Sequence, residues 1–250
     1  MDANQQQQQQ QHESILRAIA VSSMHLPTFS AQDRQSAFAI IEEFKSYDGR
    51  IALCISWLQQ EHDHYYMEHN VTTATKLLAL ETIAAFLQKN YSSISEPDRL
   101  ALRQGVLKAA QLLAGQTPAT ITEGGGGSGT MTGLRLLAKK LAAVLEGMVI
   151  RDFPQRWTTF ATDVFAPTKQ SGGLWYDEPG TYEAVHHLGV KICLECLKLV
   201  AEDCTDSDFN SKVSTKRRND VLIGLNEVSI VPSALFSITG ALHTFAAIQD

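Results

Sequence analysis

The chain has 250 residues, of which 44% are hydrophobic and 19% are charged, with a formal net charge of −6. This composition excludes a disordered chain, which would carry fewer apolar residues. The negative charge argues against a general nucleic-acid binder, because phosphate contacts need clustered Lys and Arg. The polar N-terminus lacks a signal-peptide pattern, and no apolar run approaches the roughly 20 residues of a membrane span. Four cysteines are too few for a disulfide framework, so we expect an intracellular, soluble protein.

The first sixty residues predict three helices. Residues 1–11 hold seven consecutive glutamines and should form a disordered head, or an ill-defined extension of a first helix over residues 12–23. Ser30 is a plausible N-cap for a helix that runs to Tyr47. Asp48-Gly49 signals a turn before a helix over residues 50–60. We expect these last two helices to form an antiparallel hairpin.

Two more helices and a break follow. Residues 71–91 carry apolar side chains at helical spacing. Ser95, Pro97 and Asp98 mark the start of the next helix, which extends over residues 100–113, because they supply an N-cap, a first-turn proline and an acid near the positive helix end. Residues 115–133 contain the run GGGGSG and should form a flexible loop between hairpins, since each glycine loses much backbone entropy on ordering.

The stretch from residue 134 to residue 157 organises the second half of the chain. Its apolar residues step by three or four positions and form one helical stripe: Leu134, Leu137, Leu141, Leu145 and Met148. Pro154 should end this helix near residues 151–153 and start a partner helix over residues 155–165. Phe153 and Trp157 are placed to cover the corner. Core packing is the simpler interpretation of this pair, and an exposed binding anchor is the alternative.

The remaining sequence continues the pattern. A loop over residues 167–180 precedes a helix over residues 181–204, and a second helix is predicted over residues 213–228. The second helix begins with the basic cluster Lys216, Arg217 and Arg218, which is most simply a solvated face; contact with an acidic partner or RNA phosphate is the alternative. One more helix should cover residues 234–248, where we expect a fragment boundary.

About four hairpins of roughly 40–60 residues have the period of HEAT-like α-solenoids, so we predict an all-α superhelix of antiparallel hairpins.

Metal binding and catalysis are disfavoured. The residues with ligand-like chemistry are the pair Cys193 and Cys196 and a group of acids and histidines: His62, Asp63, His64, Glu68 and His69. A zinc site built from cysteine pairs needs a second pair, so core thiols and surface histidines are the favoured interpretation. The glycine run lacks the Gly-Lys-Ser/Thr ending of a phosphate loop, and no Ser/His/Asp set stands out. We expect a non-enzyme with no catalytic residue, no metal and no cofactor.

Four short strings carry a family resemblance. They are AFAIIEEFK at residues 37–45, LALETIAAFL at residues 78–87, RDFPQRW at residues 151–157 and KRRND at residues 216–220, and their order matters more than any one of them. Together they resemble the N-terminal part of a receptor of the importin-β/exportin (karyopherin) superfamily, closest to the exportin-5 type. The polyglutamine head, the glycine loop and an insertion at residues 172–176 depart from the family pattern.

The resemblance implies a function and partners. The first repeats of such a receptor bind Ran-GTP through their inner helices, and the receptor carries structured small RNA, tRNA or protein cargo past nuclear pore proteins. It shuttles between nucleus and cytoplasm as a monomer and needs no membrane. Polar residues on the second helix of each hairpin are then candidates for contact with Ran: Gln59, Gln60, Asp98, Arg103 and Lys108.

Two other functions compete with this one. A HEAT or armadillo scaffold outside nuclear transport, which would hold other protein segments, fits the same helical pattern. A lipid-surface module is disfavoured by the negative charge and by the lack of a basic amphipathic helix.

Overall fold

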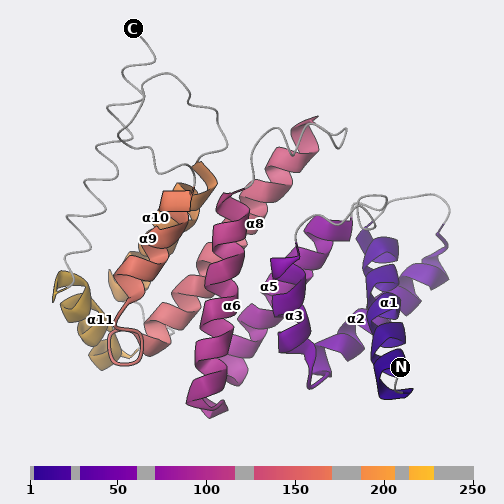
Figure 1. Cartoon of the computed structure of the whole chain (residues 1–250), viewed down its shortest axis with the longest axis horizontal. Coiled ribbons are helices and arrows are strands. Elements are labelled where there is room, and N and C mark those ends of the chain that lie inside the picture. The colour runs from indigo at the N-terminus through magenta and orange to yellow at the C-terminus, as the bar shows by residue number, and fades with distance from the viewer. Residues whose placement is uncertain are drawn as a thin grey trace, which may run out of the picture. The chain divides into compact units, whose positions relative to one another are not determined.

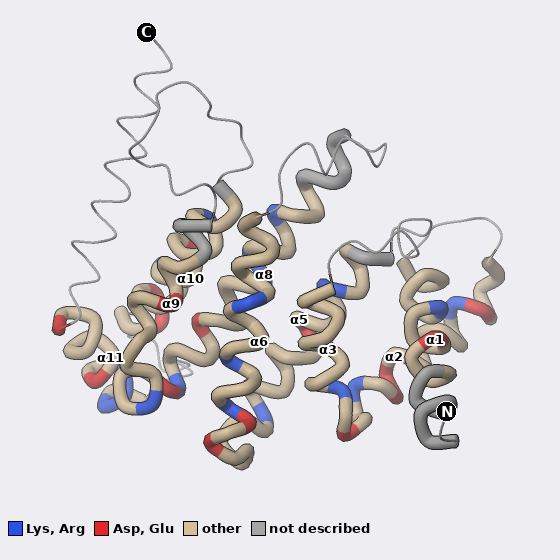
Figure 2. Tube along the Cα trace, in the orientation of Figure 1, with Lys and Arg blue, Asp and Glu red and all other residues tan. Residues whose placement is uncertain are grey.

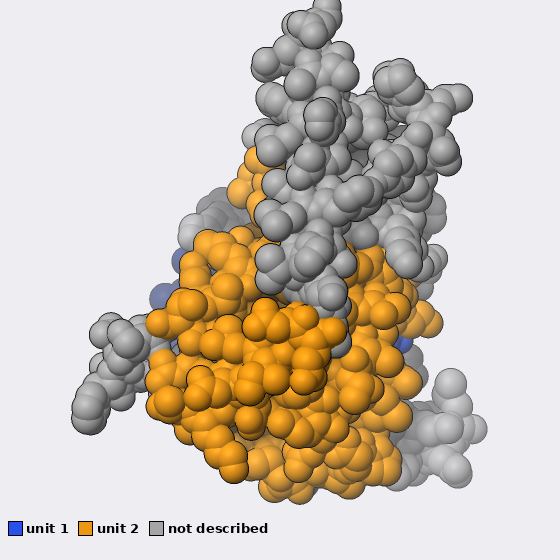
Figure 3. Space-filling model, turned by 90° about the vertical axis from the view of Figure 1, so that its left-hand side faces the viewer, with its two compact units in different colours: residues 1–86 blue, residues 87–250 orange. Residues whose placement is uncertain are grey.

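Helices are the regular elements of this protein in the computed structural model (Figure 1), which describes residues 3–23, 29–60, 71–115, 127–170, 187–205 and 214–227. No strand occurs within these ranges. The predicted all-α fold is therefore confirmed, and the successive helices fit the hairpins of a HEAT-like α-solenoid. The chain divides into two compact units, residues 1–86 and residues 87–250, which Figure 3 colours separately.

Unit 1 contains α1 (Ala3–Ser23), α2 (Ala31–Ser46), α3 (Arg50–Gln59) and most of α5 (Val71–Lys89). The helix α1 takes in the glutamine run, for which the sequence predicted disorder or an extension of the first helix. Ser30 caps α2 as predicted, because its Oγ accepts a hydrogen bond from the Asp33 amide at 3.1 Å. The Asp33 carboxylate in turn accepts one from the Ser30 amide at 2.8 Å, which completes a capping box.

The core of unit 1 is arranged around Trp57 on α3. Its side chain is 2% exposed, and its Nε1–H donates a hydrogen bond to His12 Nε2 on α1 at 2.7 Å. The Phe44 ring on α2 lies 5.2 Å from the Trp57 ring between centroids. The predicted turn at residues 48–49 does join α2 to α3, but α2 makes its larger contact with α1, whose apolar stripe includes the buried Ile15 and Ile19.

Unit 2 contains the end of α5, the short 3-10 helix η1 (Tyr91–Ser93) and five α-helices: α6 (Glu96–Ala114), α8 (Gly127–Asp152), α9 (Phe160–Gln170), α10 (His187–Thr205) and α11 (Thr215–Glu227). The long helix α8 lies at the centre, because α6, α10 and α11 all pack against it. The five residues of the predicted apolar stripe are each at most 5% exposed, so the burial of that stripe is confirmed. Ser95 caps α6 as predicted, with its Oγ 3.3 Å from the Asp98 amide.

Several predicted boundaries are wrong. The helix α8 begins at Gly127, inside the predicted 115–133 loop, and α9 runs to Gln170, past the predicted start of the 167–180 loop. Pro154 does not start the partner helix. The Asp152 carbonyl accepts hydrogen bonds from the amides of Arg156 at 2.7 Å and Trp157 at 3.2 Å, and this turn delays α9 until Phe160. The predicted helix over residues 234–248 and the rest of both loops lie outside the described residues.

We predict that Gly224→Ala destabilises the protein. A Cβ at residue 224 in α11 would lie 2.8 Å from Phe153 Cε1 and 2.9 Å from Pro154 Cβ, and the Phe153 ring is fully buried and cannot move aside. Overpacking of this kind costs about 1–3 kcal/mol, which should appear as a lower urea midpoint.

Gly147→Ala is the matched control for this substitution. The same Cβ at residue 147 in α8 meets its nearest neighbour, Leu87 Cδ1, at 3.4 Å, and alanine stabilises a helix interior by about 0.5–1 kcal/mol relative to glycine. Equal urea midpoints for the two variants would contradict the described docking of α11.

Candidate functional site at the corner after α8

The corner between α8 and α9 is a short connection, residues 153–159, built on aromatic packing. Phe153, Trp157 and Phe160 are at most 1% exposed. The Phe160 ring lies 5.2 Å from the Phe153 ring and 5.3 Å from the Trp157 ring, the latter edge to face. The structure thus places Phe153 and Trp157 in the core of unit 2, where the packing interpretation puts them, while Pro154 is partly exposed beside Gly224.

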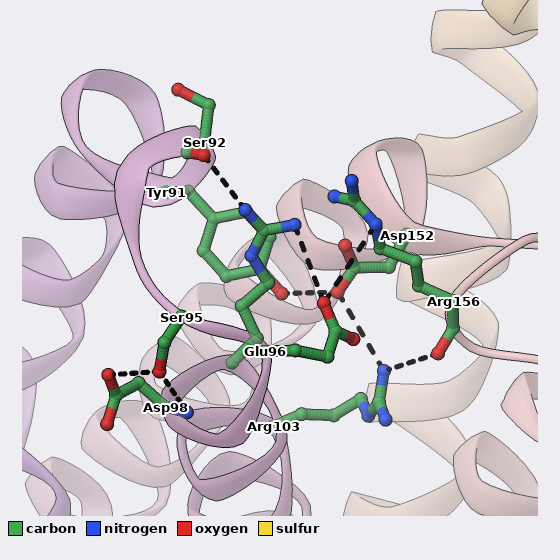
Figure 4. A network of polar contacts seen from close by, with 9 residues as sticks. Tyr91, Ser92, Ser95, Glu96, Asp98, Arg103, Asp152 and Arg156 are labelled. Carbon is green, nitrogen blue, oxygen red and sulfur yellow. Dashed lines mark hydrogen bonds and ion pairs between the residues drawn. The ribbon is translucent and has the colours of Figure 1, made fainter.

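A buried carboxylate closes α8 at this corner. Asp152 is 1% exposed, and its Oδ2 accepts a hydrogen bond from the Tyr91 hydroxyl of η1 (Figure 4). The Arg103 guanidinium of α6 lies 3.8 Å from the same oxygen. Two causes raise the pKa of Tyr91 well above its usual range: burial, which is the larger, and the hydrogen bond to Asp152. This phenol therefore stays protonated and donates. A carboxylate at such depth requires these partners, since an unpaired buried charge is very costly.

Arg103 is tied to the corner by three contacts. Besides the ion pair with Asp152, its Nη1 donates to the Arg156 carbonyl at 3.2 Å, and its Cζ lies 5.1 Å from the centre of the Trp157 ring. Only 11% of its side chain is exposed. The sequence offered Arg103 as a contact for Ran, which stays a prediction; within the chain its guanidinium contacts the turn.

A second arginine of α6 extends the network toward solvent. Arg99 donates to the Ser92 carbonyl at 2.9 Å and lies over the Tyr91 ring at 5.2 Å. The exposed Glu96 carboxylate is 3.9 Å from Arg99 Nη1 and also 3.9 Å from Arg156 Nε. The pair between Glu96 and Arg156 is exposed on both sides and is worth little in energy, whereas the Arg99 side chain is buried.

The other candidate contacts for Ran lie on the surfaces of the two units. Asp98 and Lys108 are exposed on α6, which carries acids at its beginning and bases further along (Figure 2). Asp98 also takes part in the helix cap, since its carboxylate accepts a hydrogen bond from the Ser95 hydroxyl at 2.6 Å. Gln59 and Gln60 are half-exposed at the end of α3 in unit 1. Ran contact by these four residues stays a prediction.

Arg217 is the residue of the basic cluster whose role the sequence pattern did not reveal. Its Nε donates to the Ile150 carbonyl at 2.6 Å, its Nη2 to the Phe153 carbonyl and its Nη1 to Gln155 Oε1. It therefore caps the C-terminal end of α8, where a cation is favoured by the helix dipole, and does not form part of a solvated face. Its spacing from Val221 and Gly224, both buried, is the helical signal that predicts this orientation.

The other two members of that cluster are Lys216 and Arg218. Lys216 is exposed, and Arg218 Nη2 donates to Thr215 Oγ1 at 3.3 Å on its own helix. Both sequence interpretations of Lys216 and Arg218 therefore stay predictions: a solvated face, or contact with an acidic partner or RNA phosphate.

The cysteine pair is buried in α10. Cys193 and Cys196 are at most 1% exposed, and desolvation raises the pKa of Cys193 to about 12 and that of Cys196 well above its ordinary value. Such thiols are inert hydrophobic side chains at neutral pH. No group of three or more possible metal ligands gathers in the part of the chain that the structure describes. The group from His62 to His69 lies outside that part.

Comparison with known families yields one match. Residues 135–241 match the family model described as exportin 1-like protein. The matched stretch includes most of α8, the corner, α9, α10 and α11. The match supports the importin-β/exportin superfamily and leaves the exportin-5 type unconfirmed. A search of curated proteins finds no match. Among the described helices, none is both long and apolar enough to cross a membrane.

We predict that Asp152→Asn lowers the free energy of unfolding by about 3 kcal/mol, because it leaves the largely buried Arg103 without its counter-charge. The size of the side chain is preserved, so the loss reports the charge and its hydrogen bonds. Urea denaturation followed by circular dichroism measures the effect.

The matched control is Asp98→Asn, which makes the same chemical change on the exposed surface of α6, where asparagine still accepts the hydrogen bond from Ser95. Its urea midpoint should stay close to that of the unchanged protein. If both variants lose the same stability, the Asp152 carboxylate does not organise the corner.

Proposed function

We propose that this chain is part of a karyopherin-type nuclear transport receptor that binds Ran-GTP and helps to carry cargo through the nuclear pore. The observation that carries the proposal is the match of residues 135–241 to the exportin 1-like family. Two further findings support it: the described residues form helices of the kind that this superfamily stacks, and the four family-like strings occur in the expected order. The chain would act by binding rather than by catalysis.

Linkage is the mechanism that such a receptor would use. If Ran-GTP and cargo both favour the same conformation of the stacked hairpins, each ligand raises the affinity for the other by the same factor. Hydrolysis of the Ran-bound GTP in the cytoplasm removes one ligand and so releases the other. Repeated hairpins suit this mechanism because each interface between neighbours absorbs a small part of the change. The receptor would shuttle between nucleus and cytoplasm and contact nuclear pore proteins on the way.

The finer assignment is to the exportin-5 type, with structured small RNA, tRNA or protein as cargo. It rests on the resemblance that all four strings carry together, and two of these strings, at residues 37–45 and 78–87, lie outside the matched residues. Lys216 is available for an acidic partner or RNA phosphate, whereas Arg217 is occupied by carbonyl groups at the corner. Asp98 and Lys108 are the exposed candidates on α6 for contact with Ran.

We expect the chain, immobilised on beads, to retain Ran locked in its GTP state and to leave GDP-bound Ran in solution. Combined reversal of the two exposed α6 charges, Asp98→Lys with Lys108→Glu, should weaken Ran-GTP binding at least about ten-fold, equivalent to about 1.4 kcal/mol. The net charge of the chain does not change in this variant, so nonspecific attraction is controlled.

A second reversal pair tests the location of the contact. Lys198→Glu with Glu202→Lys reverses two exposed charges on α10 and should leave Ran-GTP affinity unchanged. Equal retention of the two nucleotide states by the unchanged chain would reject the receptor and favour a HEAT or armadillo scaffold outside nuclear transport.

A further inference from the structure

We propose that the turn at residues 153–157 couples α6 to α11, so that loosening the arginine of one helix weakens the docking of the other. Two helices that are far apart in sequence each contribute an arginine that donates to this turn: Arg103 from α6 and Arg217 from α11. The coupling does not depend on Ran binding, and either proposal can fail without the other.

Arg103 of α6 contacts the last residues of the turn. Arg103 Nη1 donates to the Arg156 carbonyl at 3.2 Å, and its guanidinium covers the Trp157 ring. Figure 4 shows this guanidinium between the Asp152 carboxylate and the Arg156 carbonyl. The Arg103 side chain is only 11% exposed, although its hydrogen bond to the Arg156 carbonyl lies at the protein surface.

Arg217 of α11 contacts the first residues of the turn and the end of α8. Arg217 donates to the carbonyls of Ile150 and Phe153 and to Gln155 Oε1. Two helical turns further along α11, Gly224 lies directly against Phe153 and Pro154. The docking of α11 therefore depends on the position of the same short segment that Arg103 fixes from the other side.

The turn itself cannot absorb a displacement. Phe153 and Trp157 are buried against Phe160, and close-packed cores transmit small shifts rather than deform. Burial lowers the pKa of Arg217, and the nearby charges of Asp220 and Asp152 oppose this lowering. The element with two states is α11, which is either docked on the turn or open.

Hydrogen exchange measured by mass spectrometry tests the coupling, because it reports local opening of α11 directly. Arg103→Lys keeps the charge but loses the planar fork that bonds the Arg156 carbonyl. We expect exchange in residues 215–227 to rise by about two- to thirty-fold in this variant, the range of coupling effects between distant sites. Samples are compared at urea concentrations that give equal global stability.

Ser95→Ala is the control. It removes the N-cap of the same helix without touching the turn, and should leave exchange in α11 at the level of the unchanged protein. The same rise in α11 for Ser95→Ala and Arg103→Lys would overturn the proposal, since general loosening of α6 would then explain both.

The reciprocal experiment keeps the proposal testable if Arg103→Lys does not fold. Arg217→Lys should increase exchange in α6, residues 96–114, whereas Lys216→Ala on the exposed face beside it should not. Unchanged exchange of α6 in Arg217→Lys would show that the turn does not pass a disturbance from one helix to the other.

Discussion

A negative charge buried at the end of α8 is the constraint on which the second unit depends. Asp152 lies almost fully out of water, so the chain must bring Tyr91 and Arg103 to it. These two residues come from η1 and α6, which precede the long helix in the sequence. Pairing one carboxylate oxygen, Asp152 Oδ2, therefore fixes how two successive parts of the chain meet, and the aromatic core of Phe153, Trp157 and Phe160 forms next to that contact.

The same corner explains the role of one arginine in the basic cluster at residues 216–218. Arg217 meets the carbonyls that α8 leaves unpaired at its end, and α11 is thereby attached to the end of α8 and to the turn after it. In a stacked helical protein each hairpin contacts its neighbours, so contacts of this kind set how firmly successive hairpins are held. In the receptor function proposed above, that firmness would set how much of the ligand binding energy is used in changing the conformation.

The helices were predictable because their signals are local. Ser30 and Ser95 carry capping patterns, and the stripe of α8 follows one period, so both starts and the buried face are as predicted. The path after Pro154 was not predictable, because hydrogen bonds to the Asp152 carbonyl set the turn. The inward direction of Arg103 was also hidden, since it depends on partners about fifty residues away.

A double-mutant cycle between Arg103 and Asp152 tests the central claim most directly. Urea denaturation gives the free energies of unfolding of Arg103→Gln, Asp152→Asn and the double variant. If the carboxylate and the guanidinium require each other, the double variant loses less stability than the sum of the single losses, by about 1–3 kcal/mol. Additive losses would show that the two charges act independently, and the pairing of Asp152 with Arg103 would not be what orders the corner.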